Sequence, residues 1–584
     1  MSLVHIIDVE SGNLQSLSNA ILKIDSNYQI KFIHNESEFI KYNSEIEKLI
    51  FPGVGNFGHF VHELNNRKLS KHIKEYIESG RSIMGICVGL QSFFKISEES
   101  GSQVHGLGLL DLDLFKFNPN DDIFIEKGIK KSVPHIGWNS IEDIVINGKV
   151  ENEKSIHGIN TQNKYYFVHS YAGIIKNSEI ESKIKAYESK GWNFAIGKYG
   201  SEKFVAAISK DNLVATQFHP EKSGIVGLKI IKNFLNGEKY PEIDAKNELK
   251  KGTECTLSGL SRRIIACLDV RTNDDGDLVV TKGDQYDVRE KTDSSVRNLG
   301  KPIELATKYY NQGADEIVFL NITSFRNSPI KDLPMLEVLK KSAQTIFVPL
   351  TVGGGIKDMI DPQTGNLVPA VRIADLYFKA GADKVSIGSD AVLIAEEYYR
   401  NGKKGTGKSS IETISKTFGN QAVVISVDPK RKYISDPNET TQQVIKIENP
   451  DEFGPNDEQY CYYQVTSQGG RKIHELGALE LCIACEALGA GEILLNSIDF
   501  DGSNNGFNLQ LLKQIKTNVG IPVIASSGAG NPKHFEDVFK QDFNIDAALG
   551  AGMFHRQEYT VNDVKKYLQD NSRMDVRLSE DIEL

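Results

Sequence analysis

The residues best suited to chemistry in the first half of the chain are a cysteine and a nearby histidine–glutamate pair. Cys87 lies between Gly85 and Gly89, after the run RSIMGI and before LQSFFKI. This Gly-x-nucleophile-x-Gly pattern predicts a tight strand-to-helix turn, and the helix N-terminus behind the sulfur favours a thiolate. His219 and Glu221 follow the run LVATQF, and their i, i+2 spacing puts them on one side of an extended segment. The pattern predicts nucleophilic catalysis, with His219 as the base and Glu221 orienting it.

Four segments around these residues resemble class I glutamine amidotransferases: PGVGNFG, GICVGLQ, FVHSY and QFHPEKSG. The resemblance implies that Cys87 attacks the side-chain amide of glutamine and that His219 transfers the proton, so that glutamate and ammonia are released. Backbone N–H groups would stabilise the oxyanion. The implied oxyanion and glutamine-binding positions are Gly53, Val54, Gly55, Val88, Gln91, His169, Ser170 and Tyr171.

Two aspartates end apolar runs in the second half of the chain. Asp269 ends RIIACLD and Asp428 ends AVVISVD, the first and fifth of eight strand-like runs. In a (β/α)₈ barrel, active sites lie at the carboxyl ends of the strands, and strands one and five are opposed. The pair therefore predicts two carboxylates facing each other across a barrel mouth, one acting as acid and the other as base.

Glycine-rich turns follow several of the same runs. Glycines let backbone N–H groups approach a phosphate, and helix N-termini add a favourable dipole. The turns fall on two sides of the predicted rim, which suits a substrate with a phosphate at each end. They contain Gly354 and Gly355, Gly388 and Ser389, Asp501 and Gly502, Gly528, and Ala551 and Gly552.

Four charged residues stand at the starts of predicted strands, at the opposite end of the barrel from the aspartates. Two are basic and two are acidic, a balance that fits a salt-bridged ring around the barrel floor. These residues are Arg263, Glu316, Lys384 and Glu492.

A second resemblance covers the barrel from end to end. Segments such as RRIIACLDV, FVPLTVGGGI and GAGEILLNSIDFDGSNNGF are similar to the cyclase of the imidazole glycerol phosphate synthase family. A glutaminase ahead of it resembles the single-chain eukaryotic type. The resemblance implies that ammonia and phosphoribulosyl-formimino-aminoimidazole carboxamide ribonucleotide give imidazole glycerol phosphate and aminoimidazole carboxamide ribonucleotide.

The same resemblance assigns roles to individual residues of the barrel. Asp269 and Asp428 match the acid/base pair of the family, and Lys282 resembles a substrate-contacting lysine on a lid after the first strand. The four floor charges match a gate on an ammonia channel. Ser467 is a further candidate for a polar substrate contact.

Two units must position these residues. In residues 1–236, apolar runs first alternate with helical patterns and then follow one another without helices between them. This order predicts an α/β domain with a mixed sheet, parallel at first and then partly antiparallel. Residues 237–261 are polar and charged, and we interpret them as a linker.

In residues 262–584 a helix–Gly-Ala-Asp–strand unit recurs, as in GADEIVFLN and GADKVSIGS. Eight such runs separated by helical patterns predict a (β/α)₈ TIM barrel. Residues 395–410 and 432–459 lack core periodicity and are predicted to be solvated insertions. The strand-like runs are 264–269, 316–320, 347–351, 384–388, 422–428, 492–497, 522–526 and 546–550.

Composition excludes several other classes of protein. The net charge is 68 − 78 = −10, without a long basic run, which argues against nucleic-acid binding. No apolar run approaches the roughly 18–20 residues that span a bilayer, and the N-terminal residues lack a secretory pattern. Six cysteines in 584 residues are too few for a disulfide scaffold. These features predict a cytoplasmic protein without a membrane partner.

Three local patterns suggest ligands that we do not expect. Residues 53–58 match GxGxxG, but the next strand ends at Cys87 rather than at an acidic residue. Residues 402–409 match a P-loop, but a polar helical pattern precedes them instead of a strand. Cys482 and Cys485 lie in an apolar helical run and are predicted to pack in the core. We therefore predict no cofactor and no metal.

The predicted activity is glutamine hydrolysis coupled to a barrel reaction that consumes the ammonia. The predicted small-molecule partners are glutamine and a bis-phosphorylated ribonucleotide, and the two domains are each other's partner. One alternative is another glutaminase–barrel synthase, such as pyridoxal phosphate synthase, whose imine-forming lysine has no counterpart at a strand end here. A non-catalytic scaffold is the other alternative, and the intact set of reactive residues argues against it.

Overall fold

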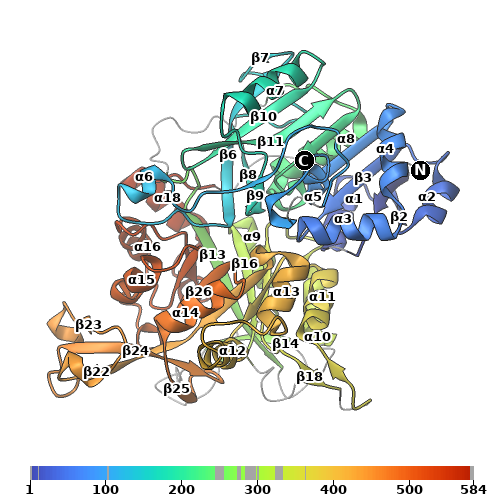
Figure 1. Ribbon diagram of the computed structural model, residues 1–584. Helices are drawn as coiled ribbons and strands as arrows, with labels where there is room; N and C mark the ends of the chain where they lie inside the picture. The colour runs from blue at the N-terminus through green and yellow to red at the C-terminus, as the bar shows by residue number, and fades with distance from the viewer. Residues whose placement is uncertain are drawn as a thin grey trace.

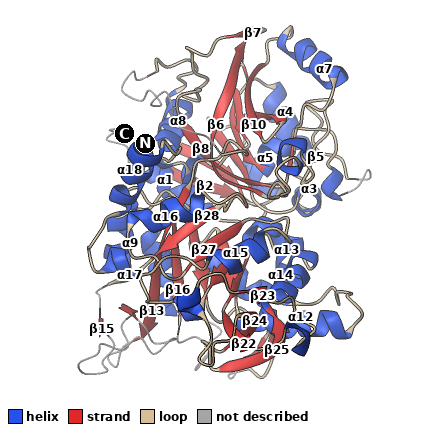
Figure 2. Cartoon of the chain, turned by 90° about the vertical axis from the view of Figure 1, so that its left-hand side faces the viewer, coloured by secondary structure: helices blue, strands red, loops and turns tan. Residues whose placement is uncertain are grey.

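The structure is a computed structural model that describes residues 3–10, 12–100, 104–243, 256–272, 278–282, 297–298, 301–322, 333–361 and 364–578. Two parts are stacked in it, an α/β domain coloured blue to green and a barrel coloured yellow to red (Figure 1). Viewed from the side, the sheet of the first part stands directly above the barrel strands (Figure 2).

A ten-stranded mixed sheet forms the first domain. The strands on the β2 side of β12 are parallel and those on the other side are antiparallel, as the sequence predicted. The order is β2 (Gln29–Ile33), β1 (Leu3–Ile7), β3 (Lys48–Gly53), β4 (Ser82–Cys87), β12 (Leu213–Thr216), β11 (Glu202–Lys210), β10 (Asn193–Tyr199), β6 (His135–Ile146) and β7 (Lys149–Val150), with β8 (Lys164–His169) paired to β6.

The helices of this domain include one that the sequence analysis missed. Helix α7 lies between β8 and β10, where we expected strands to follow one another directly. Its weak apolar pattern explains the error, since Ile184 is its one buried residue. The helices are α1 (Leu14–Ile24), α2 (Glu36–Tyr42), α3 (Phe57–Asn66), α4 (Ser70–Glu78), α5 (Val88–Gln91), α6 (Asp122–Ile125), α7 (Ser178–Glu188) and α8 (Gly224–Asn236).

Eight parallel strands close into a barrel through the pairing of β13 with β28. This confirms the predicted TIM barrel. The strands are β13 (Arg263–Thr272), β16 (Glu316–Asn321), β17 (Leu350–Gly353), β20 (Lys384–Ile387), β21 (Val423–Val427), β26 (Glu492–Asn496), β27 (Val523–Ser526) and β28 (Ala547–Gly550). The helices are α9 (Pro302–Asn311), α10 (Leu333–Ser342), α11 (Ala370–Ala380), α12 (Ser389–Arg400), α13 (Ser410–Phe418), α14 (Ala478–Ala487), α15 (Leu509–Lys516), α16 (Pro532–Phe539), α17 (Gly552–His555) and α18 (Val561–Ser572).

The third strand begins three residues later than the predicted run 347–351. Phe347 packs in the core of the first domain, and its carbonyl accepts a hydrogen bond from the backbone N–H of Gly224 at 2.9 Å. The apolar start of this run therefore serves the contact between the two parts rather than the barrel strand.

The two predicted insertions are more ordered than expected. Helix α12 continues to Arg400 and buries Ala395, so only residues after it form an exposed loop. Residues 432–459 contribute to a small antiparallel sheet instead of a simple loop. Its strands are β22 (Pro429–Ile434), β24 (Tyr460–Ser467), β23 (Ile445–Lys446) and β25 (Lys472–Gly477).

Successive side chains of β13 point alternately into the barrel and toward the core outside it. Ile265 and Cys267 belong to the small cluster inside the barrel, whereas Ile264 and Ala266 pack in the large cluster outside it. By the same period of two, Arg263 and Asp269 face inward. One strand thus places a cation at the floor and a carboxylate at the mouth.

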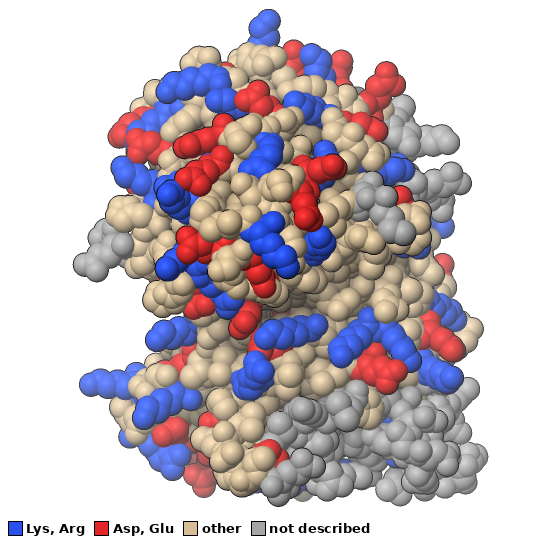
Figure 3. Space-filling model, turned by 90° about the vertical axis from the view of Figure 1, so that its right-hand side faces the viewer, with Lys and Arg blue, Asp and Glu red and all other residues tan. Residues whose placement is uncertain are grey.

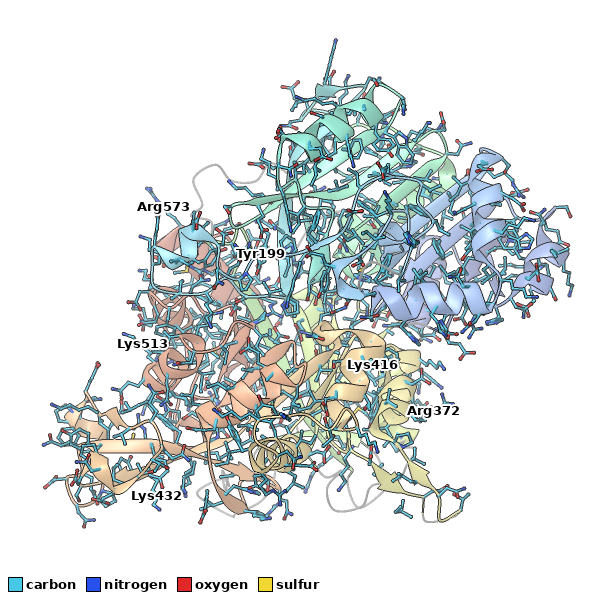
Figure 4. The ribbon with its side chains drawn as sticks, viewed as in Figure 1. Tyr199, Arg372, Lys416, Lys432, Lys513 and Arg573 are labelled. Atoms are coloured by element: carbon cyan, nitrogen blue, oxygen red, sulfur yellow. The ribbon has the colours of Figure 1, made fainter. Side chains whose placement is uncertain are left out.

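The first domain docks on the floor of the barrel. The small sheet and the hairpin β18 (Met359–Ile360)–β19 (Leu367–Val368) lie on the opposite side of the barrel (Figure 1). Lys222 pairs with Asp383 at 2.7 Å across the interface. Tyr199, labelled in Figure 4, lies inside the first domain close to this boundary.

A segment that follows α18 also joins the two parts. The guanidinium of Arg577 lies 4.1 Å from the ring centre of Trp138, and its Nη2 donates to the carbonyl of Ala314 at 2.7 Å. Asp575 pairs with Lys164 of β8. The barrel therefore holds the first domain partly through residues that come after its last helix.

The surface carries both signs of charge. Acidic and basic side chains are interspersed over the face drawn in Figure 3, and this face is hollowed between the two parts. Among the described residues, none of the helices combines the length and the apolar character needed to cross a membrane.

Candidate active sites

Cys87 occupies a strained turn between β4 and α5. Its φ angle is 52°, a left-handed value that non-glycine residues rarely adopt. The turn is possible because a glycine follows it closely: a Cβ atom on Gly89 would lie 2.0 Å from the carbonyl oxygen of Phe51. Strain of this kind is held by surrounding structure and is common at functional sites. The first helical residue, Val88, brings the N-terminal end of α5 beside the sulfur.

His219 and Glu221 lie beside Cys87. His219 comes just after β12, and a 3₁₀ turn, Pro220–Lys222, holds Glu221. The Nδ1 atom of His219 lies 2.7 Å from Oε1 of Glu221, and both residues are buried. Burial alone would lower the pKa of His219, but the Glu221 carboxylate and the Cys87 sulfur raise it well above its ordinary value. The arrangement favours the imidazolium form of His219.

Gln217 is a neighbour of Cys87 that the sequence analysis did not single out. Its Nε2 donates to the sulfur at 3.6 Å, and its Oε1 accepts from Nε2 of Gln91 at 3.2 Å. Gln91 also donates to the carbonyl of Tyr171 at 2.9 Å. The signal was present, because Gln217 is the first letter of the quoted segment QFHPEKSG.

His169 and Ser170 lie behind the hydrogen-bonded group formed by Gln91, Gln217 and the carbonyl of Tyr171, rather than within it. His169 is buried, and its Nδ1 donates to the same carbonyl of Tyr171 at 2.9 Å. Burial lowers the pKa of His169 to about 3, so the ring is neutral, and its Nε2 faces His135 at 3.1 Å. The carbonyl of Ser170 accepts from Phe117 at 3.0 Å. Both residues support the position of Tyr171.

The loop with Gly53, Val54 and Gly55 lies at the end of β3, beside Cys87. Gly53 is paired in register with Cys87. Gly55 has a φ of 108°, and a Cβ on it would lie 2.8 Å from the carbonyl oxygen of Thr417 in the barrel. The loop that we predicted to bear oxyanion donors therefore rests directly on the barrel.

A cavity of about 40 Å³ lies between the two parts. It is lined by residues from both sides of the interface. Among them are Cys87, His219, Tyr166, Asp383 and Lys384. The same space thus touches Cys87 of the first domain and Lys384 at the floor of the barrel.

Four charges close a ring at that floor. Arg263 lies 2.9 Å from Glu316 and also pairs with Glu492. Lys384 lies 2.7 Å from Glu316 and 2.6 Å from Glu492. Each of the four side chains is 1% exposed or less. The Arg263 and Lys384 cations overcome the effect of burial and lower the pKa of Glu492.

Carboxylates gather at the opposite end of the barrel. Burial, together with the carboxylates of Asp501 and Asp428, raises the pKa of Asp269 to about 7. Asp428 follows β21, and its Oδ1 accepts a hydrogen bond from Nδ2 of Asn496 at 2.8 Å. Asp269 is therefore divided between its charged and neutral forms near neutral pH, which suits a proton-transfer group.

The predicted phosphate turns lie at the carboxyl ends of barrel strands. Gly388 and Ser389 open α12, and Ala551 and Gly552 open α17. Positive φ angles occur at Gly354 (112°), Gly355 (71°), Gly502 (70°) and Gly528 (92°). Asp501 differs from the other turn residues, because its carboxylate contributes to the raised pKa of Asp269. The backbone of Lys282 ends β14 (Leu278–Lys282), and its side chain lies outside the described residues.

An α/β domain with a Cys–His–Glu site, docked on a closed barrel, defines a two-part amidotransferase. Comparison with known families agrees: the model described as "Glutamine amidotransferase class-I" matches residues 5–237. The model described as "Histidine biosynthesis protein" matches residues 263–560.

The chain belongs to the imidazole glycerol phosphate synthase family. It is 51% identical to imidazole glycerol phosphate synthase hisHF of Emericella nidulans, over 100% of both chains. It is 51% identical to the hisHF protein of Schizosaccharomyces pombe, over 97% of this chain and 98% of that one. The chloroplastic hisHF protein of Arabidopsis thaliana is 46% identical over 99% of this chain and 90% of its own.

Proposed function

We propose that this chain is a bifunctional synthase that hydrolyses glutamine in its first domain and uses the ammonia in its barrel. The barrel substrate is phosphoribulosyl-formimino-aminoimidazole carboxamide ribonucleotide. The products are imidazole glycerol phosphate and aminoimidazole carboxamide ribonucleotide. Membership of the family and full-length similarity to proteins with this name support the proposal.

The interdomain cavity is the observation that carries the coupling of the two reactions. Free ammonia is protonated and diluted in water, so coupling requires a protected path. The cavity touches Cys87 on one side and Lys384 of the charged ring on the other. Ammonia released from glutamine would thus meet the ring of Arg263, Glu316, Lys384 and Glu492 without leaving the protein.

Roles within the first site follow from its charges. Cys87 attacks the glutamine amide carbon, and His219 gives a proton to the departing ammonia. Water then cleaves the thioester, with His219 as the base. The backbone N–H of Val88 and one N–H of the loop with Gly53, Val54 and Gly55 stabilise the oxyanion. Gln91 and Tyr171 border the glutamine side chain, with His169 and Ser170 behind them.

In the barrel, Asp269 and Asp428 transfer protons, and the pKa of Asp269 near 7 supports this role. The turns at Gly354 and Gly355 and at Gly388 and Ser389 bind one phosphate. Those at Gly502, Gly528, Ala551 and Gly552 bind the other. Lys282 and Ser467 contact the part of the substrate that lies between the two phosphates.

We also propose the domain boundaries and the location of the protein. The domains divide at residues 1–236 and 262–584, with a linker at 237–261 of which residues 244–255 lie outside the described part. A cytoplasmic location is supported by the five described cysteines, which are all buried and free.

The decisive test is a coupled assay on the full chain with identification of both products. Purified protein is given glutamine with and without the ribonucleotide, and glutamate, imidazole glycerol phosphate and aminoimidazole carboxamide ribonucleotide are measured. We expect all three products, and faster glutamate release when the acceptor is present. Glutamate release without the two ribonucleotide products would refute the proposed barrel reaction.

A further inference from the structure

Ser467, a proposed substrate contact, forms a hydrogen-bonded relay with a histidine and a glutamate that have no role in the two sites described above. Ser467 ends β24, His474 lies on β25, and Glu396 lies on α12. The Oγ of Ser467 is 2.8 Å from Nε2 of His474, and Nδ1 of that ring is 2.8 Å from Oε1 of Glu396. Ser467 and His474 are 5% and 6% exposed. The Glu396 side chain is 35% exposed, so the relay runs from a buried serine and histidine to a partly exposed carboxylate, which together hold the His474 ring in one orientation.

The direction of the hydrogen bonds in the relay follows from which atoms can donate and which can accept. A carboxylate can only accept, so Nδ1 of His474 carries the hydrogen that bonds Glu396. In a neutral ring the other nitrogen, Nε2, is then an acceptor, and the hydroxyl of Ser467 donates to it. The oxygen of Ser467 keeps its lone pairs for another partner. With the His474 ring neutral, Ser467 is thereby prepared to accept a hydrogen bond rather than to donate one.

The neighbours of Ser467 in the chain tie it to two parts of the barrel mouth. The N–H and Oγ1 of Thr466 donate to the carbonyl of Asp428 at 3.0 and 2.7 Å. The N–H of Gln468 donates to Oγ of Ser389 at 2.9 Å. Gln468 has a φ of 56°, a strained value that these surrounding bonds maintain. Ser467 therefore lies between a proposed acid/base residue and a proposed phosphate turn.

The small sheet meets the barrel at the end that carries Ser467 and also at Arg431 of β22, whose N–H donates to Oδ2 of Asp499 after β26 at 2.7 Å. Its outer part, where Lys432 is labelled in Figure 4, projects away from the barrel. The end that carries Ser467 and His474 is joined to α12 and to β21 by the bonds described above. This connection gives the ordered segment around residues 432–459 a role in shaping the mouth.

We infer that Glu396 and His474 are positioning residues that hold Ser467 as a hydrogen-bond acceptor for a hydroxyl or N–H group of the phosphorylated barrel substrate. The inference rests on the proposed function and deepens it. The recognised group is a donor next to the phosphate that binds at Gly388 and Ser389. A phosphate dianion has no proton to donate and would not bind the oxygen of Ser467 directly.

The test measures synthesis from ammonium salts by the full chain, so that the glutaminase step is bypassed. Removing the relay bond in Ser467→Ala or His474→Ala raises the KM for the ribonucleotide about 5- to 10-fold, as expected for one hydrogen bond. The kcat changes less than about twofold, because proton transfer by the aspartates is untouched. The double variant shows about the same KM as either single variant, since both remove one coupled unit.

Variants of Glu396 separate positioning from simple packing. Glu396→Ala raises the KM several-fold, about as one lost hydrogen bond requires. Glu396→Gln restores it, because the amide oxygen still accepts from Nδ1 of His474. Glu397→Ala is the matched control, one residue along α12 and exposed, and leaves both constants unchanged. Thermal unfolding of each variant checks that the fold is retained.

Two results would overturn the inference while leaving the proposed function intact. One is an unchanged KM in Glu396→Ala and His474→Ala. The other is additive loss in the double variant, which would mean that Ser467 and His474 act separately. If the unmodified chain makes no imidazole product from ammonium salts, the proposed function itself fails, and this inference fails with it.

Discussion

The two candidate sites use buried charge in opposite ways. At Cys87, burial disfavours the charged form of His219, but the Glu221 carboxylate and the Cys87 sulfur raise its pKa well above the ordinary value. At the barrel mouth, like charges gather, and the pKa of Asp269 is raised to about 7 by burial and by Asp501 and Asp428. The first site thus stores an ion pair before the substrate arrives. The second leaves its protonation state open, which suits a step that must both give and take a proton.

The largest effect that would separate the two sites comes from Cys87→Ala. Glutamine-dependent synthesis should fall by about 10⁴-fold or more, as for loss of a nucleophile in other triads. Synthesis from ammonium salts should continue, because the barrel mouth is at the far end of the molecule. Steady-state rates with each nitrogen source give the comparison. Loss of both activities in a folded variant would show that the sites are not separable.

Asp269→Asn tests the other site. The amide cannot take or give the proton, so synthesis should fall by about 10²- to 10⁴-fold with either nitrogen source. Glutamate release from glutamine should persist. If ammonium-dependent synthesis kept its rate, proton transfer at the mouth would have to be assigned elsewhere.

A substitution in the charged ring tests how much the ring between the two sites contributes to stability. Lys384→Met leaves Glu316 and Glu492 with one cation instead of two. The free energy of unfolding should fall by about 3–5 kcal/mol, the usual cost of breaking a buried ion pair. Lys379→Met, at a half-exposed lysine of α11 paired with Asp375, should change it by less than about 1 kcal/mol. Chemical denaturation measures both, and equal losses would contradict a special role for the ring.

The smallest effect sharpens the electrostatic contrast itself. Asp501→Asn removes one like charge beside Asp269, so the pKa of Asp269 should fall from about 7. The deprotonated form then persists to lower pH. The limb of the pH–rate profile that reports Asp269 should move to lower pH, with rates expressed per unprotonated ammonia. Asp499→Asn is the control, since Asp499 bonds the backbone of Arg431 instead. If this limb does not move, Asp501 does not influence the pKa of Asp269.

Local spacing predicted most of the fold and brought out the candidate reactive residues. The period of two on β13, which puts Arg263 at the floor and Asp269 at the mouth, can be read from one short run. The i, i+2 spacing of His219 and Glu221 is equally local. These features need no knowledge of distant segments.

The parts that could not be predicted depend on contacts between distant segments. The hydrogen bonds beside Cys87 join Gln91 to residues far along the chain. Tyr171 and Gln217 lie 80 and 126 positions after Gln91. The third barrel strand begins late because Phe347 packs against the other domain. The relay of Ser467, His474 and Glu396 needs the small sheet, which composition alone made look like a loop.

The contact of Arg577 and Asp575 with the first domain has a consequence for the order of events during synthesis. Domains generally fold as units in the order in which they leave the ribosome. The first domain can therefore fold early, but two of the residues that hold it to the barrel are made only after the whole barrel has been translated. Until then Trp138 lacks its cation, and the interface that encloses Cys87 is incomplete. A nascent chain would thus hold a folded amidotransferase domain before it holds a coupled enzyme.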